Sequence, residues 1–353
     1  MIKRSSAAPQ LPASTVPAVS ELPASEPPLV IAFVNNMPDA ALEAAETQFQ
    51  SLAEAAAGHT RIHFSKFYLP GVPRLERGRQ YLSQSYSPLS RLIDSPVDGL
   101  IVTGAVPSGS TFEGEPYWPS FTKLADWANA NGVPAYWSCL AAHAAVKHFD
   151  GIERFRMPRK LSGVFECEKA AAGPLVAGVP LRWQVPHSRY NDLREDDLIA
   201  AGYRIVSRLK SGSPDIFVNP RHNLSVFAQG HPEYDRMTLF YEYRRDLGQF
   251  LRGQSGVSPH PPEGYFGPGT AESIERLDGM VPPGACAEEH LRVIEELLAK
   301  AVITASWRTV AVRVFANWIK LLLKERSRRR PARAAGAARA APALPAGIEW
   351  RAK

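Results

Sequence analysis

Cysteine is scarce in this chain: Cys139, Cys167 and Cys286 are the three among 353 residues. An odd count without a C-x-x-C spacing excludes a disulfide framework and a cysteine-based zinc site. The sequence also lacks clustered metal ligands and a glycine-rich phosphate loop. These absences predict a protein of a reducing compartment, the cytoplasm, whose chemistry uses no metal and no redox cofactor.

Long apolar runs are absent as well. Two basic residues near the start, Lys3 and Arg4, are followed by six prolines before residue 29 and not by an apolar stretch. The run Leu321 to Leu323 is too short, and too close to lysines on both sides, to cross a bilayer. The sequence therefore predicts no signal peptide, no membrane span and no membrane partner. We interpret the three leucines as a face packed on the core or on a second subunit, and we expect a homodimer.

Positive charge is concentrated at one end of the chain. The whole chain carries a formal +6, while residues 326 to 353 hold seven Arg and one Lys against one Glu, which is +7. The remainder therefore carries −1 by difference and is nearly neutral. Because no aromatic residues alternate with these arginines, we expect a solvated tail and no nucleic-acid partner.

Composition divides the chain into three parts. Residues 1 to 28 form an Ala/Pro/Ser-rich leader and residues 326 to 353 an Arg/Ala/Pro-rich tail. Both have too few apolar residues to fold alone, so we expect them to be disordered. Residues 29 to 325 should form the catalytic domain, because a chain with 45% hydrophobic residues can bury a large core.

Strand and helix patterns alternate through the expected domain. Continuous apolar runs at Leu29 to Val34, Gly99 to Thr103 and Ala135 to Ser138 predict buried strands. This order predicts an α/β fold, with a mostly parallel sheet flanked by helices and reactive groups at the carboxyl ends of strands. Further strands are predicted at 61 to 67, 203 to 206, 216 to 218 and 224 to 228; helices at 40 to 57, 121 to 130, 237 to 251, 288 to 300 and 307 to 325; and a Gly/Pro-rich loop at 252 to 287.

Cys139 lies at the junction of a predicted strand and a predicted helix that starts at Leu140. At a helix N-terminus the macrodipole and the free backbone N–H groups favour thiolate over thiol. The amide of Leu140 would point toward a carbonyl attacked by the sulfur and serve as an oxyanion donor. A lone cysteine among apolar residues is otherwise simple core filling.

His231 and Glu233 decide between these two interpretations. On extended backbone, side chains at i and i+2 share a face, so Glu233 can orient the imidazole of His231 toward a thiol from elsewhere in the fold. Together with Cys139 they supply a nucleophile, a base and an orienter. We interpret His187 as structural, because no partnered carboxylate lies two residues after it.

Several motifs occur in a fixed order along residues 29 to 325. They are Asn35-Asn36-Met37-Pro38 with Glu46-Thr47-Gln48-Phe49, Asp98 to Ala105 with Tyr117-Trp118, Lys160 to Glu166, Pro186 to Tyr190, Gly230 to Asp235 with Glu242, Arg245 and Asp246, Ser306-Trp307-Arg308, and Asn317-Trp318. In this order and spacing the chain resembles the homoserine O-succinyltransferase and O-acetyltransferase family. The resemblance implies a class I glutamine amidotransferase-like (flavodoxin-like) fold with a C-terminal helical extension.

The resemblance also implies roles for residues outside the triad. Lys160 and Ser188 correspond to family positions near the acyl group. Glu242 and Arg245 lie on the helix assigned to the substrate pocket, where a guanidinium is well shaped to hold an acceptor's carboxylate. We add the amide of Ala105 to that of Leu140 as an oxyanion donor.

The chain departs from the family at two places. The elbow reads Cys139-Leu140-Ala141-Ala142-His143 where the family usually has Cys-Trp-Gly-Ala-Gln, so Ala141 replaces a glycine that eases a tight turn. Ser108 replaces the Gly that accompanies succinyl transfer or the Glu that accompanies acetyl transfer. Because Ser108 is small and uncharged, it leaves room for a succinyl carboxylate and favours succinyl-CoA.

The predicted function is transfer of a succinyl or acetyl group from acyl-CoA, as a cosubstrate, to L-homoserine through a Cys139 acyl-enzyme, a step of methionine biosynthesis. Other acceptors such as serine stay open. So do two different activities: amide hydrolysis, as in related glutaminases, and a non-catalytic paralogue that binds a metabolite. The sequence does not locate the binding site of CoA.

Overall fold

A computed structural model of the chain describes residues 27–279, 287–298, 303, 305–334 and 351–352. The predictions for the leader up to residue 26 and for tail residues 335 to 350 lie outside these residues, as does Cys286.

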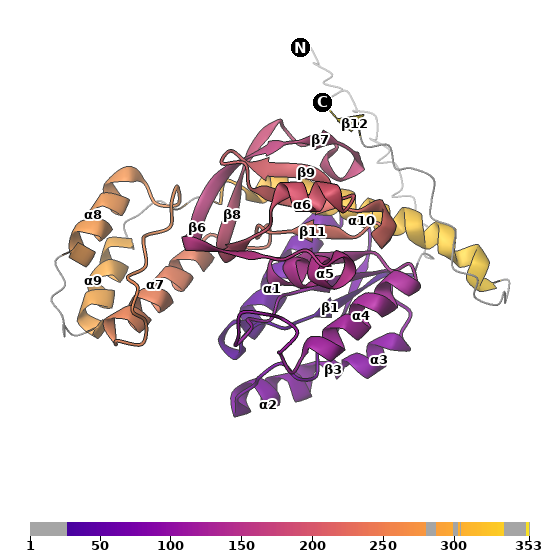
Figure 1. Cartoon of the computed structure of the whole chain (residues 1–353), viewed down its shortest axis with the longest axis horizontal. Coiled ribbons are helices and arrows are strands. Elements are labelled where there is room, and N and C mark those ends of the chain that lie inside the picture. Colours follow the sequence, from indigo (N-terminus) through magenta and orange to yellow (C-terminus); the bar gives the residue numbers. More distant parts are fainter. Residues whose placement is uncertain (1–26, 280–286, 299–302, 304, 335–350, 353) are drawn as a thin grey trace, which may run out of the picture.

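One sheet of ten strands forms the centre of the described structure (Figure 1). Its strands follow the order β3-β2-β1-β4-β5-β11-β10-β9-β6-β8. The first six of these run parallel to one another. They are β1 (Leu29–Val34), β2 (Ile62–Tyr68), β3 (Ser87–Pro88), β4 (Gly99–Val102), β5 (Ala135–Ser138) and β11 (Val226–Ala228). The predicted α/β fold is confirmed, and so are the predicted strands of this half, all of these except β3.

The other half of the sheet is antiparallel and includes a hairpin that the sequence analysis missed. The hairpin pairs β6 (Phe155–Lys169) with β8 (Arg182–Asp192). Because β6 contains Pro158, Gly163 and many charged residues, no apolar run marks it as a strand. The other strands of this half are β9 (Arg204–Leu209) and β10 (Pro214–Val218). A separate pair joins β7 (Ala171–Ala172) to β12 (Arg351–Ala352).

Helices cover both faces of the parallel half, as predicted (Figure 1). Alternating residues of β1 divide between two cores: Ile31 and Phe33 enter one, Ala32 and Val34 the other. The first core is covered by α1 (Leu42–Ala56) and α10 (Arg308–Ala334). The second is covered by α3 (Leu89–Ile93), α4 (Trp118–Ala130) and α5 (Leu140–Asp150). Two further helices are α2 (Glu76–Ser85) and α6 (Glu195–Ala200).

Three helices form a lobe beside the sheet, at the left of Figure 1. They are α7 (Thr238–Leu251), α8 (Pro268–Gly279) and α9 (Ala287–Leu298). The prediction of a loop from 252 to 287 is wrong for the residues of α8. A proline is tolerated in the first turn of a helix, and the residues that follow Gly269 suit a helix, so the Gly/Pro content of the whole segment misled the prediction.

The predicted start of the tail at residue 326 is also wrong, because α10 continues to Ala334. Arg326 is buried, at 8% exposure, and donates to the backbone oxygens of Pro27 and Pro28 at 3.0 and 3.2 Å. Its guanidinium lies 3.8 Å from Asp98. A buried cation with these acceptors belongs to the folded body. The run Leu321 to Leu323 packs on the core, where Leu322 is fully buried against Gly99.

We predict that Arg326→Ala lowers the free energy of unfolding by about 1–3 kcal/mol, because it leaves buried acceptors without their charged donor. Arg328→Ala is the matched control: this side chain is about half-exposed and pairs with Glu325 at 3.8 Å, so its loss should cost less than about 0.5 kcal/mol. Urea unfolding of both variants is the measurement. Equal effects would show that the end of α10 is not anchored through Arg326.

Candidate active site

Cys139 occupies a strained turn between β5 and α5. Its backbone has φ 51° and ψ −114°, a conformation that costs a non-glycine residue about 1–3 kcal/mol. The Cys139 N–H donates to the Ala228 carbonyl at 2.7 Å, which holds the turn against the end of β11. The strain is therefore at Cys139 itself. Ala141 lies inside α5, so the absence of a glycine there does not tighten the turn.

His231 and Glu233 reach the same place from the neighbouring strand. Because β11 runs parallel to β5, with Ala228 opposite Ser138, the segment after β11 passes beside the elbow. His231 Nδ1 lies 2.7 Å from Glu233 Oε1, and both side chains are buried. Burial alone would lower the pKa of His231, but Glu233 and Cys139 together raise it well above its ordinary value. The three predicted triad residues are thus neighbours in space.

Tyr234 connects this group to a second polar cluster, and the sequence analysis gave it no role. Its ring stacks on the His231 ring at a centroid distance of 4.3 Å. Its hydroxyl donates to Glu242 Oε1 at 2.7 Å, and Trp307 Nε1 donates to its carbonyl at 3.0 Å. The available signal was an aromatic residue directly after the carboxylate of the predicted pair.

The second cluster, made of Lys160, Ser188, Glu242 and Asp246, gathers side chains from the β6–β8 hairpin and α7. Lys160 Nζ lies 2.7 Å from Asp246 Oδ2 and 3.6 Å from Glu242 Oε2. The Ser188 hydroxyl donates to Glu242. The structure therefore joins three of the predicted substrate-binding residues, and it adds Asp246, which sequence reasoning had named only within a motif.

Arg245 and Ser108 are turned toward carboxylates of the chain itself. The Arg245 side chain is about half-exposed, and its Nε and Nη2 both donate to Asp246 Oδ1, at 2.9 and 2.7 Å. The Ser108 hydroxyl donates to Glu115 Oε1 at 2.9 Å. Ser108 is thus not an isolated uncharged side chain, because a buried carboxylate accompanies it.

The two predicted oxyanion amides lie on adjacent backbone segments. Gly104 approaches the start of α5 so closely that a Cβ there would lie 2.4 Å from Leu140 Cβ. The amide of Leu140 is in the first turn of α5, where N–H groups have no acceptor within the helix. Ala105 and Leu140 are among the residues that line a small cavity of about 10 Å³.

Two further histidines are buried near the elbow and are uncharged. His143 Nε2 lies 2.7 Å from Gln229 Oε1, and burial lowers the pKa of His143 to about 3. No carboxylate lies two residues after His187, but one that is distant in sequence lies near it: His187 Nε2 is 3.4 Å from Asp215 Oδ1. Burial, the largest influence, still lowers the pKa of His187.

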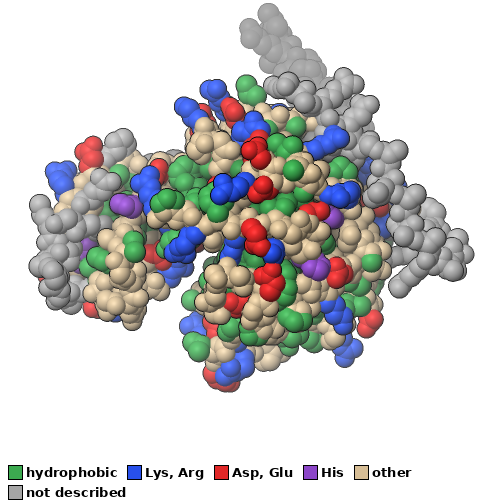
Figure 2. All heavy atoms as spheres, viewed as in Figure 1, with side chains coloured by type: hydrophobic (Ala, Val, Ile, Leu, Met, Phe, Trp, Pro, Cys, Tyr) green, Lys and Arg blue, Asp and Glu red, His purple; other side chains and the backbone are tan. Residues whose placement is uncertain are grey.

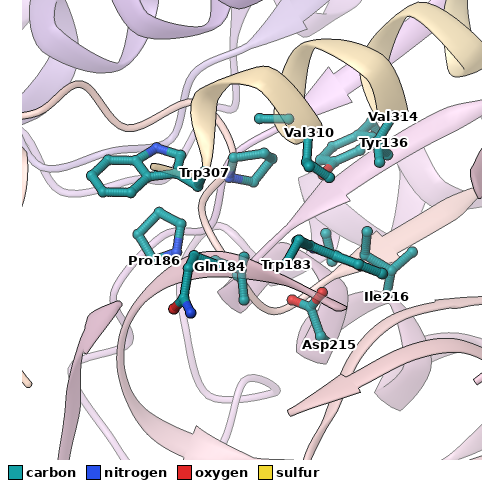
Figure 3. Close-up of a pocket in the computed structure, with 14 residues that line it drawn as sticks. Tyr136, Trp183, Gln184, Pro186, Asp215, Ile216, Trp307, Val310 and Val314 are labelled. Carbon is teal, nitrogen blue, oxygen red and sulfur yellow. The ribbon is translucent and has the colours of Figure 1, made fainter. Parts of the chain in front are cut away.

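An apolar cavity lies behind the site, between β8, β10 and α10 (Figure 3). Its volume is about 20 Å³, which is room for a single water molecule. Figure 3 shows Trp307, Val310 and Val314 above it and Asp215 below. A cavity this small is too closed for a substrate.

Within the described ranges, no group of three or more His, Cys, Asp or Glu side chains could hold a metal ion. None of the helices in the described part is long and apolar enough to span a membrane.

Comparison with known proteins identifies the family. A family model described as homoserine O-succinyltransferase matches residues 19–328. The chain belongs to this family. Proteins named homoserine O-succinyltransferase from Methylorubrum extorquens and Rhodopseudomonas palustris are 41% and 40% identical, over 83% and 84% of this chain and 87% and 88% of their own. One from Bradyrhizobium japonicum is 44% identical over 67% of this chain and 74% of its own length.

Among solved structures, a glutamine amidotransferase from Thermotoga maritima is similar with a TM-score of 0.46 and 12% identity, over 84% of this chain and 99% of that one. A glutamine amido transferase from Methylobacillus flagellatus has a TM-score of 0.43 at 15% identity, over 83% and 94%.

In this homoserine O-succinyltransferase family member we predict that iodoacetamide labels Cys139 well before Cys167. Cys139 is partly exposed beside His231, whereas Cys167 is fully buried, and burial raises the pKa of its thiol. Because the pKa of His231 is raised, the imidazolium that favours a thiolate persists at and above neutral pH. Labelling of Cys139 near neutral pH should therefore depend on this imidazolium, and His231→Ala should move the labelling profile to higher pH.

Peptide mass spectrometry in a Cys286→Ser background measures the two rates. Equal labelling of Cys139 and Cys167, or an unchanged pH profile in His231→Ala, would contradict an activated thiol.

Proposed function

We propose that this chain transfers a succinyl group from succinyl-CoA to the hydroxyl of L-homoserine, a step of methionine biosynthesis, through an acyl-enzyme on Cys139. The observation that carries the proposal is the position of Cys139 on a strained elbow beside an imidazole that is bonded to a buried carboxylate. The names of the curated relatives support the substrates. We place this reaction in the cytoplasm.

In the first half-reaction the Cys139 sulfur attacks the thioester carbonyl of the donor. The new C–S bond places negative charge on the carbonyl oxygen, which the amides of Leu140 and Ala105 would stabilise. Collapse of this intermediate breaks the bond to the CoA sulfur, and the imidazolium of His231 supplies the proton that lets CoA leave as a thiol. The product is a succinyl thioester on Cys139, with His231 neutral.

In the second half-reaction His231 takes the proton of the homoserine hydroxyl. The oxygen then attacks the succinyl thioester, the C–S bond breaks, and Cys139 returns as a thiolate beside an imidazolium. Glu233 keeps Nδ1 of the ring bonded throughout, so Nε2 is the nitrogen that exchanges protons. Metal and redox cofactors have no step to perform in this scheme.

The acceptor would bind in the cluster between the triad and α7. Glu242 and Asp246 offer carboxylates to the ammonium group of homoserine, and Lys160 and Arg245 offer cations to its carboxylate. Arg245 must exchange its bond to Asp246 for one to the substrate. Because the Arg245 side chain is about half-exposed, the exchange costs little.

Intact-protein mass spectrometry tests the acyl-enzyme. Incubation with succinyl-CoA should add one succinyl group to the native chain and none to Cys139→Ser, and L-homoserine should remove it. The same experiment with acetyl-CoA and with L-serine determines the donor and the acceptor. An adduct that appears equally on Cys139→Ser, or that homoserine does not remove, would overturn the proposed mechanism.

We further predict that Arg245→Ala keeps a burst of CoA release without acceptor but loses turnover with homoserine by about 10²-fold or more, because the carboxylate of the acceptor loses its bidentate partner. Arg244→Ala is the matched control, since the neighbouring arginine pairs with Glu295 of the lobe. Stopped-flow CoA release and steady-state rates are the measurements. Loss of the burst in Arg245→Ala would assign this residue to the donor or to the fold.

A further inference from the structure

An exposed aromatic ring lies beside two cations on the β6–β8 hairpin. Tyr190 of β8 is 44% exposed. The Arg156 guanidinium carbon lies 5.0 Å from the centroid of its ring, and Lys160 Nζ lies 5.8 Å from it. Both cations come from β6, across the hairpin. Large exposed aromatic residues beside positive charge are typical of sites that bind ligands with a flat ring and an anionic group.

Arg156 differs from the cations near it in having no carboxylate partner among the described residues. Arg159 lies 3.2 Å from Glu263, and Lys160 lies 2.7 Å from Asp246. Arg156 is exposed, and its guanidinium lies over the Tyr190 ring. Its charge is therefore available to an anion from outside the chain. Figure 2 shows Lys and Arg side chains gathered over the hairpin, beside the notch that separates the body from the α7–α9 lobe.

The Tyr190 patch, defined as Tyr190 with Arg156, is continuous with the proposed active site. Ser188 and Tyr190 are i and i+2 on β8 and share a face of the strand. Lys160 contacts both the Tyr190 ring and Asp246. From there, Ser188 bonds Glu242, and Glu242 bonds Tyr234, which stacks on His231. A ligand that starts at Cys139 and follows these contacts outward ends over the Tyr190 ring.

We propose that the Tyr190 patch binds the adenosine end of the acyl-CoA donor, a proposal that rests on the proposed function. The groups of acyl-CoA follow the same order as these contacts: a reactive thioester, a long pantetheine arm, and a phosphorylated adenosine at the far end. The adenine would stack on the Tyr190 ring, and Arg156 would pair with a phosphate. The thioester would then lie at Cys139, with the arm passing Lys160 and Ser188.

Donors of two lengths test this assignment. Succinyl-CoA carries the adenosine phosphates, whereas succinyl-pantetheine has the same thioester and arm without them. Tyr190→Ala and Arg156→Ala should each lower kcat/KM for succinyl-CoA about tenfold, mainly through KM, as expected for losing one stacked ring or one phosphate contact. Neither substitution should change kcat/KM for succinyl-pantetheine by more than about twofold.

Two control variants define the interaction. Tyr190→Phe keeps the ring and should retain the native KM for succinyl-CoA. Arg182→Ala removes an exposed arginine at the other end of β8 and should change neither donor. Equal losses with both donors would overturn the proposal, because the patch would then serve the acyl pocket or the fold. Unchanged kinetics with succinyl-CoA in both alanine variants would also overturn it.

A binding measurement separates this proposal from the proposed function. Adenosine 3′,5′-bisphosphate, titrated by calorimetry, needs no turnover. The native chain should bind it, and Tyr190→Ala and Arg156→Ala should each weaken binding about tenfold. If the native chain binds this ligand and the variants bind it more weakly, the patch is supported even when no acyl transfer is found. Absence of acyl transfer would then count only against the proposed function. Absent or unaltered binding overturns the patch even if transfer is normal.

Discussion

The parallel pairing of β5 with β11 is the constraint on which the site depends. These strands are separated by almost ninety residues of sequence, yet Ala228 lies opposite Ser138, and its carbonyl accepts the Cys139 N–H. This bond ties the strained elbow to the strand that delivers His231. A shift of one residue in the register would turn the side chains after β11 to the other face of the sheet. The relation between thiol and imidazole is therefore a property of the sheet and not of either loop.

The charged groups of the site compensate one another, first around His231 and then in the cluster around Glu242. His231 lies between a carboxylate and a sulfur that together raise its pKa, whereas His143 and His187, buried nearby, have lowered pKa values and are neutral. Tyr234 separates the triad group from the cluster around Glu242, where cations and carboxylates alternate. A positive charge near the sulfur and mixed charges farther out suit an anionic nucleophile and a zwitterionic acceptor.

The sequence predicted the parallel half of the fold well, because buried parallel strands are continuous apolar runs. Leu29–Val34 and Ala135–Ser138 were predicted with their observed bounds. It failed for β6, whose charged and proline-containing sequence gains its strand partners only in the folded sheet. The end of α10 was missed for a related reason: an arginine-rich segment has no apolar signal, and Arg326 is buried by contacts with Asp98 and with the residues just before β1.

For the site, local sequence could place Cys139 at a turn and His231 beside Glu233. Motif matching supplied Lys160, Ser188, Glu242 and Arg245, whose roles stay predictions. Sequence could not show that the Arg245 guanidinium is already paired with Asp246, or that the Ser108 hydroxyl donates to Glu115. Both facts depend on side-chain orientation across elements, which neither periodicity nor spacing encodes.

The position of α10 has a consequence for how the protein is made. This helix is synthesised after β1 and α1, yet it packs on α1 and covers a core that contains β1. The Trp307 indole just before it holds the backbone of Tyr234. A ribosome-bound chain that has emerged only through α9 would display an uncovered apolar sheet face. This face can therefore be covered only after α10 has left the ribosome, and until then its apolar strands are open to aggregation.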